Sequence, residues 1–393
     1  MINPGSYEKF GDGLSNSSKN AVYKLLAAIT QLNKNIAKDP DNIMRYKKVY
    51  DKQIAKIAHD FDKEWKSWAD NDIGKAYIAG LKYSEEEMRR LGLNKNIVKD
   101  VSNGSFLIDN PPPAPIPEIP GQTLLLFKEY ENHPRFFGVF RNAAYYGLEE
   151  QRFQIIRKAN DIYRQSAILA AERTFQEADI FTRLKFSQEI LDELAKKGIQ
   201  TITYKNGAKY SLDTYCEMAG RTLTGRASLQ ASLNRFLQSG YTLVVVSSHF
   251  RACDLCTPYE GKTLSIERHP VYESVDDAET QGLFHPNCKH DISVWFEGME
   301  KQKPRLASGE QYLVDKHGYK EAQKISYNAQ IRQRQIERNI RNWKRRSIVS
   351  LENNSKKFAD KKVKYWQMRQ REHLKENTFL NRKYSREQIG KAH

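Results

Sequence analysis

Two short segments of the chain concentrate cysteine and histidine. Cys253 and Cys256 lie in SSHFRACDLCTPYEGK, and His285, Cys288 and His290 follow in HPNCKH. A Cys-x2-Cys pair lets two thiolates reach one zinc ion from a tight turn, and the gap between His285 and Cys288 is the same. Any four of these side chains would complete a tetrahedral site. The spacing therefore predicts a structural Zn²⁺ centre that links the two segments and pins the loop between them.

Other interpretations of the same residues stay open. The thiols could form a reduced cluster that is held by packing alone. A cysteine beside histidine and aspartate could be a nucleophile, and HPNCKH has a grouping similar to the His-Asn-His of some metal nucleases. Neither of these two catalytic interpretations gives every residue a consistent role. No acidic cluster for Mg²⁺ and no phosphate-binding glycine loop is evident in the sequence. We expect no catalytic residues, with a zinc-dependent, nuclease-like DNA-processing enzyme as the alternative.

Cysteine usage and hydropathy limit the class of protein. The chain of 393 residues has four cysteines, and all but one lie in the two segments. The longest apolar stretch is near residues 241–246, which is far shorter than a membrane-spanning helix requires. The first residues lack the basic and apolar blocks of a signal peptide. We therefore expect synthesis in a cytoplasm, reduced thiols rather than a disulfide framework, and no membrane span.

The positive charge of the chain is confined to its last quarter. Residues 301–393 hold 25 Lys and Arg against 9 Asp and Glu, a net charge of +16 that equals the net charge of the whole chain. Residues 1–300 are therefore neutral. A neutral body with a basic tail favours a polyanionic partner, and we expect double-stranded DNA bound without sequence specificity. A basic helical surface that is merely solvated is the other interpretation.

Apolar periodicity predicts helices through most of the body. Within residues 1–109, apolar side chains recur at helical spacing on one face: Tyr46, Tyr50, Ile54, Ile57, Phe61, Trp65 and Trp68. Residues 122–200 return to helix, with a serine cap at Ser187 and a stop at Gly198.

After residue 200 the apolar side chains follow the two-residue period of β-strands. Alternating residues on both sides of Asn206-Gly207 predict a hairpin. Asp213 is placed to cap the next helix, which stops near Gly240. The β-branched residues of YTLVVVSS predict a strand that leads into the first cysteine segment.

The basic tail is predicted to form two long helices. The first contains YNAQIRQRQIERNIRNWKRR with a narrow apolar stripe, and the second contains FADKKVKYWQMRQREHLKENTFL. The expected DNA-binding residues are Arg332, Arg334, Arg338, Arg341, Lys344, Arg345, Arg346, Lys361, Lys362, Lys364, Arg369 and Arg371. We expect the basic residues within 341–346 to face solvent. Trp343, Tyr365 and Trp366 are candidates for stacking on bases or for packing between the helices.

A proline-rich stretch divides the chain. NPPPAPIPEIPG at residues 110–121 cannot form helix or central strand, so it is expected to be an extended linker. The predicted organisation is an N-terminal helical region (1–109), the linker (110–121), a helical body with a small β element and the Cys/His motif (122–300), and a basic helical tail (301–393). The predicted fold class is mainly α, with a small β region around a zinc-pinned loop and long basic C-terminal helices.

The two cysteine segments and their flanks form a longer pattern. It contains Ser247, His249, Arg251, Gly261 and Lys262, then Asn287, Cys288 and His290, then Phe296 and Gly298. Upstream, Asn206, Gly207, Tyr215, Arg221 and Thr222 occur in a matching order. This pattern resembles the phage minor capsid protein 2 family, with Lys289 where that family usually has Arg. The resemblance covers roughly residues 75–390.

The cysteines themselves are more similar to Mu F-like head morphogenesis proteins. Those proteins carry Cys-x2-Cys and a later His-Pro-x-Cys-Arg-Cys, and His290 stands where their last Cys would be, which leaves the fourth ligand open. Both families are minor structural proteins of tailed-phage heads. The resemblance implies a protein of the capsid interior, present in a few copies near the portal and made in the bacterial host cytoplasm. Its implied partners are portal and capsid proteins and packaged DNA, with a role in head assembly or DNA ejection.

Overall fold

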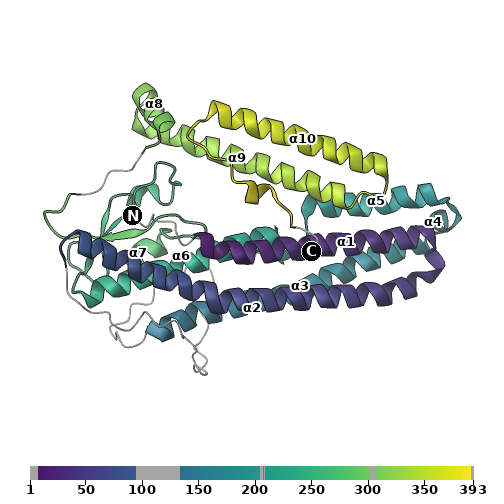
Figure 1. Cartoon of the computed structure of the whole chain (residues 1–393), viewed down its shortest axis with the longest axis horizontal. Coiled ribbons are helices and arrows are strands. Elements are labelled where there is room, and N and C mark those ends of the chain that lie inside the picture. The colour runs from purple at the N-terminus through teal and green to yellow at the C-terminus, as the bar shows by residue number, and fades with distance from the viewer. Residues whose placement is uncertain (1–7, 94–132, 204–206, 208, 301–305, 391–393) are drawn as a thin grey trace. The chain divides into compact units, whose positions relative to one another are not determined.

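Most of the protein is helical. The computed structural model describes residues 8–93, 133–203, 207, 209–300 and 306–390, and most of these residues are in helices (Figure 1). The predicted mainly α class with a small β region is confirmed. The proline-rich stretch 110–121 lies outside the described residues, so the linker and the domain boundaries built on it stay predictions. None of the described helices is long and apolar enough to cross a membrane.

The helices vary from a single turn to more than ten turns. The long ones are α1 (Glu8–Lys38), α2 (Ile43–Arg90), α3 (His133–Ala171), α5 (Ile180–Lys197), α6 (Leu212–Gln238), α9 (Tyr319–Ile348) and α10 (Asn353–Glu376). The short ones are α4 (Arg173–Glu177), α7 (Val275–Thr280) and α8 (Ser308–His317), with 3-10 turns η1 (Pro40–Asn42), η3 (Thr257–Tyr259) and η4 (Tyr384–Glu387). Both helices predicted for the basic tail are confirmed as parts of α9 and α10.

The chain forms two compact units, each assembled from three separate stretches. The first unit comprises Met1–Gly13, Lys66–Tyr146 and Glu217–Tyr327, and the second comprises Leu14–Trp65, Gly147–Cys216 and Asn328–His393. Most of the basic tail therefore belongs to the second unit, together with much of α1, α2 and α3.

The apolar stripe predicted for the N-terminal region is the packing face of α2. Its members from Tyr50 to Trp68 are all at most 8% exposed, while Tyr46 at the start is only partly buried. In the second unit the Tyr50 hydroxyl donates to the carbonyl of Ala159 on α3 at 3.1 Å. The Ser166 hydroxyl of α3 donates to Asn33 Oδ1 of α1 at 3.0 Å. Apolar burial and a few buried hydrogen bonds thus join α1, α2 and α3.

Two small antiparallel sheets interrupt the helices. The predicted hairpin is confirmed as β1 (Gln200–Thr203) paired with β2 (Lys209–Ser211). The other sheet belongs to the first unit and has the order β4-β3-β5, with β3 (Leu243–Val246) between β4 (Thr263–Ser265) and β5 (Ile292–Val294). Strand β3 is the strand predicted to lead into the first cysteine segment. One face of this sheet contributes to a core that includes Phe236 of α6 and Met88 of α2.

Helix boundaries were predicted better at their ends than at their starts. Gly198 and Gly240 follow α5 and α6 with φ of 70° and 81°, as stops should. The predicted cap at Ser187 is wrong, because α5 begins two turns earlier, where Asp179 accepts the Thr182 N–H at 2.8 Å. The predicted cap at Asp213 is also wrong, since it lies inside the first turn of α6.

The carboxylate of Asp213 is instead bound by an arginine of α9. Asp213 and Arg345 form an ion pair in which both side chains are at most 6% exposed. Burial alone would raise the pKa of Asp213, but Arg345, Ser211 and Arg341 outweigh burial and hold that pKa below its ordinary value. This pair ties the basic tail to the start of α6 within the second unit.

The expectation that residues 341–346 face solvent is wrong for Arg341 and Arg345. They are 9% and 5% exposed, because α9 is buried on more of its circumference than the narrow stripe of Ile336 and Ile340. Arg341 donates to the backbone carbonyl of Arg386, and the partly exposed Arg346 pairs with Asp192 of α5. Guanidinium groups at these positions therefore make structural contacts inside the protein.

Loss of the buried Arg345 charge should destabilise the second unit. Arg345→Met should lower its free energy of unfolding by about 3–5 kcal/mol, because the Asp213 carboxylate is left buried without its partner. Urea unfolding followed by circular dichroism measures this. The control is Arg369→Met, which removes an exposed ion pair with Glu372 and should leave the unfolding midpoint nearly unchanged. Equal, small effects of both substitutions would contradict a structural role for Arg345.

Candidate metal centre

Strand pairing brings the two cysteine segments together. Strands β3 and β5 are antiparallel, and Val246 at the end of β3 pairs with Ile292 at the start of β5. The next residues continue the contact: the Ser247 N–H donates to the Asp291 carbonyl at 2.8 Å, and the Asp291 N–H donates to Ser247 Oγ at 2.9 Å. The chain leaving β3 and the chain entering β5 therefore lie side by side, although 44 residues separate them.

The first segment folds into a tight turn. The carbonyl of Cys253 accepts the N–H of Cys256 at 3.0 Å and the N–H of Thr257 at 2.9 Å. Turn η3 follows, with Tyr259 buried at 5% exposure, and Gly261 at φ 68° returns the chain toward β4. The turn points both thiols of the Cys-x2-Cys pair to one side, as a zinc half-site requires.

The second segment turns in the same way. The Cys288 N–H donates to the carbonyl of His285 at 2.8 Å, which closes a short turn over Pro286 and Asn287. Asn287 adopts a φ of 67°, a left-handed conformation that asparagine tolerates better than most residues. Its N–H donates to the Thr222 hydroxyl of α6 at 3.3 Å, which anchors the turn to the helix that precedes the sheet.

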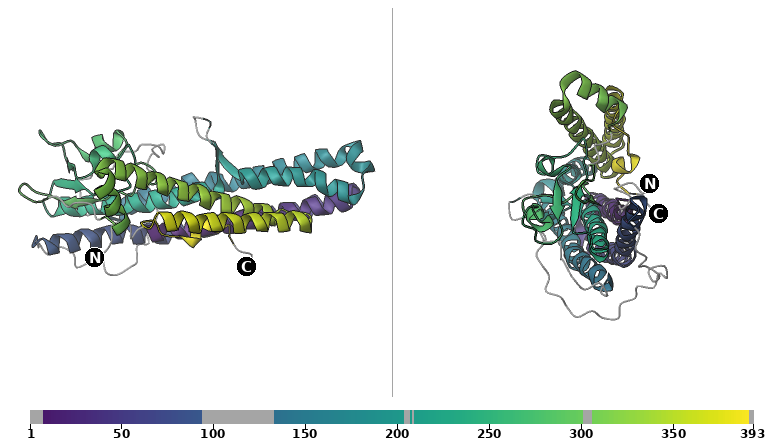
Figure 2. Two further views of the ribbon diagram at one scale, coloured as in Figure 1. Left: turned by 90° about the horizontal axis from the view of Figure 1, so that it is seen from above. Right: turned by 90° about the vertical axis from the view of Figure 1, so that its left-hand side faces the viewer.

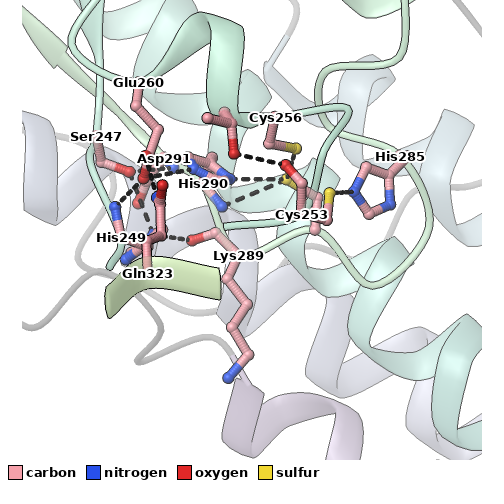
Figure 3. Close-up of polar contacts among 12 residues, drawn as sticks. Ser247, His249, Cys253, Cys256, Glu260, His285, Lys289, His290, Asp291 and Gln323 are labelled. Atoms are coloured by element: carbon pink, nitrogen blue, oxygen red, sulfur yellow. Dashed lines mark hydrogen bonds and ion pairs between the residues drawn. The ribbon is translucent and has the colours of Figure 1, made fainter. Parts of the chain in front are cut away.

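All five predicted ligands lie in one cluster. Figure 3 shows His285 beside Cys253, whose Sγ lies 3.0 Å from His285 Nε2. Cys256 Sγ lies 3.6 Å from Cys288 Sγ, which is 3.4 Å from His290 Nδ1. Ligand atoms around one tetrahedral zinc ion lie about 3.5–3.8 Å apart by the usual bond lengths. The donor types suit Zn²⁺, and the Cys256–Cys288 and Cys288–His290 distances are close to this spacing, whereas Cys253 and His285 lie closer together.

The five donors form two overlapping groups of three. One consists of Cys253, Cys256 and His285 and the other of Cys256, Cys288 and His290, and the ligand atoms within each lie within 4.8 Å of one another. Both imidazoles have an outer partner on the ring nitrogen that faces away from the thiols. His285 Nδ1 lies 2.9 Å from the carbonyl of Pro286, and His290 Nε2 lies 3.5 Å from a Glu260 oxygen. Zinc-binding histidines use such partners to fix their tautomer, so either ring suits the fourth position.

The thiols and imidazoles polarise one another. A hydrogen bond with the Cys256 thiol, helped by His290, lowers the pKa of Cys288 against the effect of burial. The same hydrogen bond and burial raise the pKa of Cys256. Burial alone would lower the pKa of His290, but its contacts with Cys288 and Glu260 outweigh it and raise that pKa to about 9. The lowered pKa favours negative charge at Cys288, whereas the raised pKa values favour the protonated forms of Cys256 and His290, whose protons a metal ion would displace.

The row of Cys288, His290 and Glu260 also has the order of a thiol nucleophile, its base and an orienting carboxylate. Access argues against that use, because His290 is only 7% exposed. A second thiol, Cys256, already occupies the near side of Cys288. The core beneath includes Cys256, with Cys253 and Cys288 packed against it, so the thiols lie at the edge of the apolar core.

Further polar side chains that the spacing of Cys and His does not predict surround the five donors. Glu260 contacts the His249 backbone N–H and His290, and it accepts from Gln323 Nε2 of α9 at 3.0 Å (Figure 3). The rings of His249 and His290 meet edge to face with centroids 4.8 Å apart. His249 Nε2 lies 2.6 Å from the Lys289 carbonyl. The family pattern had singled out His249, but no spacing rule identifies Glu260 or Gln323.

Comparison with known proteins agrees with this motif. Residues 143–375 match the family model described as phage minor capsid protein 2, a range that holds all five cluster residues and nearly all of α10. The chain belongs to the phage minor capsid protein 2 family. A structural protein of Lactococcus phage LL-H is 27% identical over 227 residues, which cover 53% of this chain and 58% of the relative. No solved structure matches the chain.

Metal content provides the test of the centre. Protein purified without chelator should contain close to one zinc ion per chain, and Cys256→Ser or Cys288→Ser should lose it and lower the melting temperature, because metal binding is coupled to folding. Cys216→Ser is the control, since Cys216 is the remaining cysteine and lies buried in the second unit. Elemental analysis and thermal melts measure both effects. Metal-free wild-type protein with unchanged stability would contradict the assignment.

Single histidine variants should resolve the fourth ligand. Because the cluster offers one donor more than zinc needs, only one of His285→Ala and His290→Ala should reduce zinc content strongly. Titration with a chromophoric chelator measures the zinc affinity of each variant. Equal and complete loss in both would mean that the site takes a different set of ligands from the four-coordinate one expected here.

Proposed function

We propose that this chain is a minor structural protein of a tailed-phage or prophage head. It sits inside the capsid near the portal and contacts packaged DNA through its basic C-terminal tail. It aids head assembly or DNA ejection. Family membership supports the virion role, and the charge distribution carries the DNA contact, since residues 301–393 account for the whole net charge of +16.

The proposal places DNA contact on the exposed part of the tail. Among the residues named from the sequence, the exposed ones are Arg332, Arg338, Lys361, Lys364, Arg369 and Arg371. Arg334, Lys344, Arg346 and Lys362 are partly buried, and Arg341 and Arg345 are buried. The partly buried Lys362 also faces aromatic rings, with Nζ 5.5 Å from the Phe358 centroid and 6.0 Å from that of Trp343. Of the aromatic candidates, Trp343 thus packs between α9 and α10.

Zinc has a structural role in this proposal. An ion held by four of the five clustered donors would cross-link the segment that leaves β3 to the segment that enters β5. It would fix the loop between them without taking part in a reaction. The first unit would then offer a rigid surface for portal or capsid proteins.

Copurification with other virion components tests the proposed function. In lysates of cells producing phage particles, tagged protein should copurify with portal and capsid proteins and with DNA, and DNase treatment should release the DNA alone. Purified protein should bind unrelated duplex sequences equally, with affinity that falls steeply as salt rises, because counterion release drives binding. Copurification with portal but no DNA binding at low salt would contradict DNA contact and leave the virion role intact.

The alternative function is a zinc-dependent nuclease. The proximity of two imidazoles, three thiols and Glu260 is the observation that favours it. Supercoiled plasmid incubated with the protein and Mg²⁺ or Mn²⁺ should remain intact if the role is structural. Cleavage by the wild-type protein that disappears in both His285→Ala and His290→Ala would favour the enzyme.

A further inference from the structure

A single row of cations runs along α10. Lys357, Lys361, Lys364, Arg371 and Lys375 follow one another at intervals of three, four or seven residues, which places them on one face of the helix. Met368 fills the position that the interval of seven leaves open. At a rise of 1.5 Å per residue the row is about 27 Å long. That length corresponds to about eight base pairs of duplex DNA at 3.4 Å per step.

The row faces away from the packing face of α10. All of its residues are exposed, whereas Ala359 and Gln370 on the other side are completely buried. That buried side meets α9, where a ring nitrogen of His373 lies 2.8 Å from the carbonyl of Ala329. Figures 1 and 2 show the two helices running alongside each other. The row is therefore the outer edge of the helical pair.

The charges of the row are not neutralised within the protein. In the described part of the chain, no ion pair involves any of these five side chains, whereas Arg345, Arg346 and Arg369 each have a carboxylate partner. Like charges three or four residues apart destabilise a helix, so the row weakens α10 in isolation. A polyanion lying along it would remove that repulsion.

The composition of the row distinguishes DNA from a protein partner. Four of its cations are lysines, which are depleted at the centre of protein interfaces and serve as point charges for phosphates. Met368, 39% exposed, is its single large apolar member, so the row lacks the aromatic anchors of a protein hot spot. The row contains no Asn or Gln for bidentate contacts with adenine, and its regular spacing along the helix suits a line of phosphates.

We propose that this row, and not the arginine-rich face of α9, is the surface that contacts the DNA backbone. The inference rests on the proposed function and makes it specific. Lys357 and Lys375 mark the ends of the contact, and the duplex lies parallel to α10. The arginines at 341, 345 and 346 serve to hold α9 in the second unit and leave the DNA contact to α10.

The test removes the row and compares it with a matched control. The row variant carries Lys357→Gln, Lys361→Gln, Lys364→Gln, Arg371→Gln and Lys375→Gln. The control variant changes four exposed lysines and one exposed arginine of α2: Arg45→Gln, Lys48→Gln, Lys52→Gln, Lys56→Gln and Lys63→Gln. Both lose the same charge from the full chain and keep a residue of good helix propensity. Binding to two unrelated 30-base-pair duplexes is measured by fluorescence anisotropy between 50 and 200 mM salt.

The row variant should bind at least about 100-fold more weakly at 50 mM salt, and its slope of log affinity against log salt should fall by about four. The control variant should keep most of the wild-type affinity and slope. Thermal unfolding should show the row variant as stable as the wild-type protein or more so, since repulsion within α10 has been removed. A row variant that folds normally but no longer binds DNA would show that these side chains contact DNA and are not needed for folding.

Any other result of this experiment contradicts a specific part of the proposal. If the row variant binds like the wild-type protein, the row is not the DNA surface, while DNA contact elsewhere on the tail survives. If the wild-type protein binds neither duplex at low salt, the proposed DNA contact itself fails. If the row variant instead loses copurification with portal while the wild-type protein ignores DNA, the row recognises an acidic protein face.

Discussion

The candidate centre depends on the antiparallel pairing of β3 with β5. Each strand is only three or four residues long, yet their register places the end of one opposite the start of the other. Two turns that are distant in the sequence therefore begin as neighbours. A shift of one residue in this register would move every side chain of β5 to the other face of the sheet. It would also carry Cys288 and His290 away from the Cys-x2-Cys turn, so the cluster and the sheet are specified together.

The cations of the tail fall into a buried group and an exposed group. In α9 two arginines are buried, where Arg345 meets a buried carboxylate and Arg341 a backbone carbonyl. Guanidinium suits such places because it is planar, always charged and able to donate several hydrogen bonds. In α10 the lysines dominate and stay in water. A net charge counted from the sequence overstates what is available to a partner, because it includes the charges already used within the fold.

Much of the fold could be predicted from the sequence because its signals are local. The stripe of α2, the hairpin at Asn206-Gly207 and the stops at Gly198 and Gly240 each follow from period or from backbone freedom within a few residues. Helix starts were harder, since Asp179 and Ser187 are both good caps and only the burial of Ser187 within α5 decides between them. The family was also recognisable, because its motif residues lie in two short stretches.

The remaining features depend on contacts between distant segments. The sequence identified the five clustered donors, but not Glu260 beside them, because a glutamate in a turn has no distinguishing pattern. The inward direction of Arg341 and Arg345 was missed for the same reason: their partners lie on η4 and at the start of α6. In the sequence of the tail every cation looks alike, and only the carboxylates and carbonyls of other elements show which of its charges already have partners.

Glu260 links the loop around the cysteine cluster to the start of α9. Its carboxylate is shared among the His249 backbone, His290 and Gln323 in the first turns of α9. An interaction that orders the loop therefore also favours order at the beginning of that helix. By thermodynamic linkage, ordering of the helix favours order in the loop by the same coupling free energy. One shared carboxylate couples the order of the loop to that of the first turns of the helix.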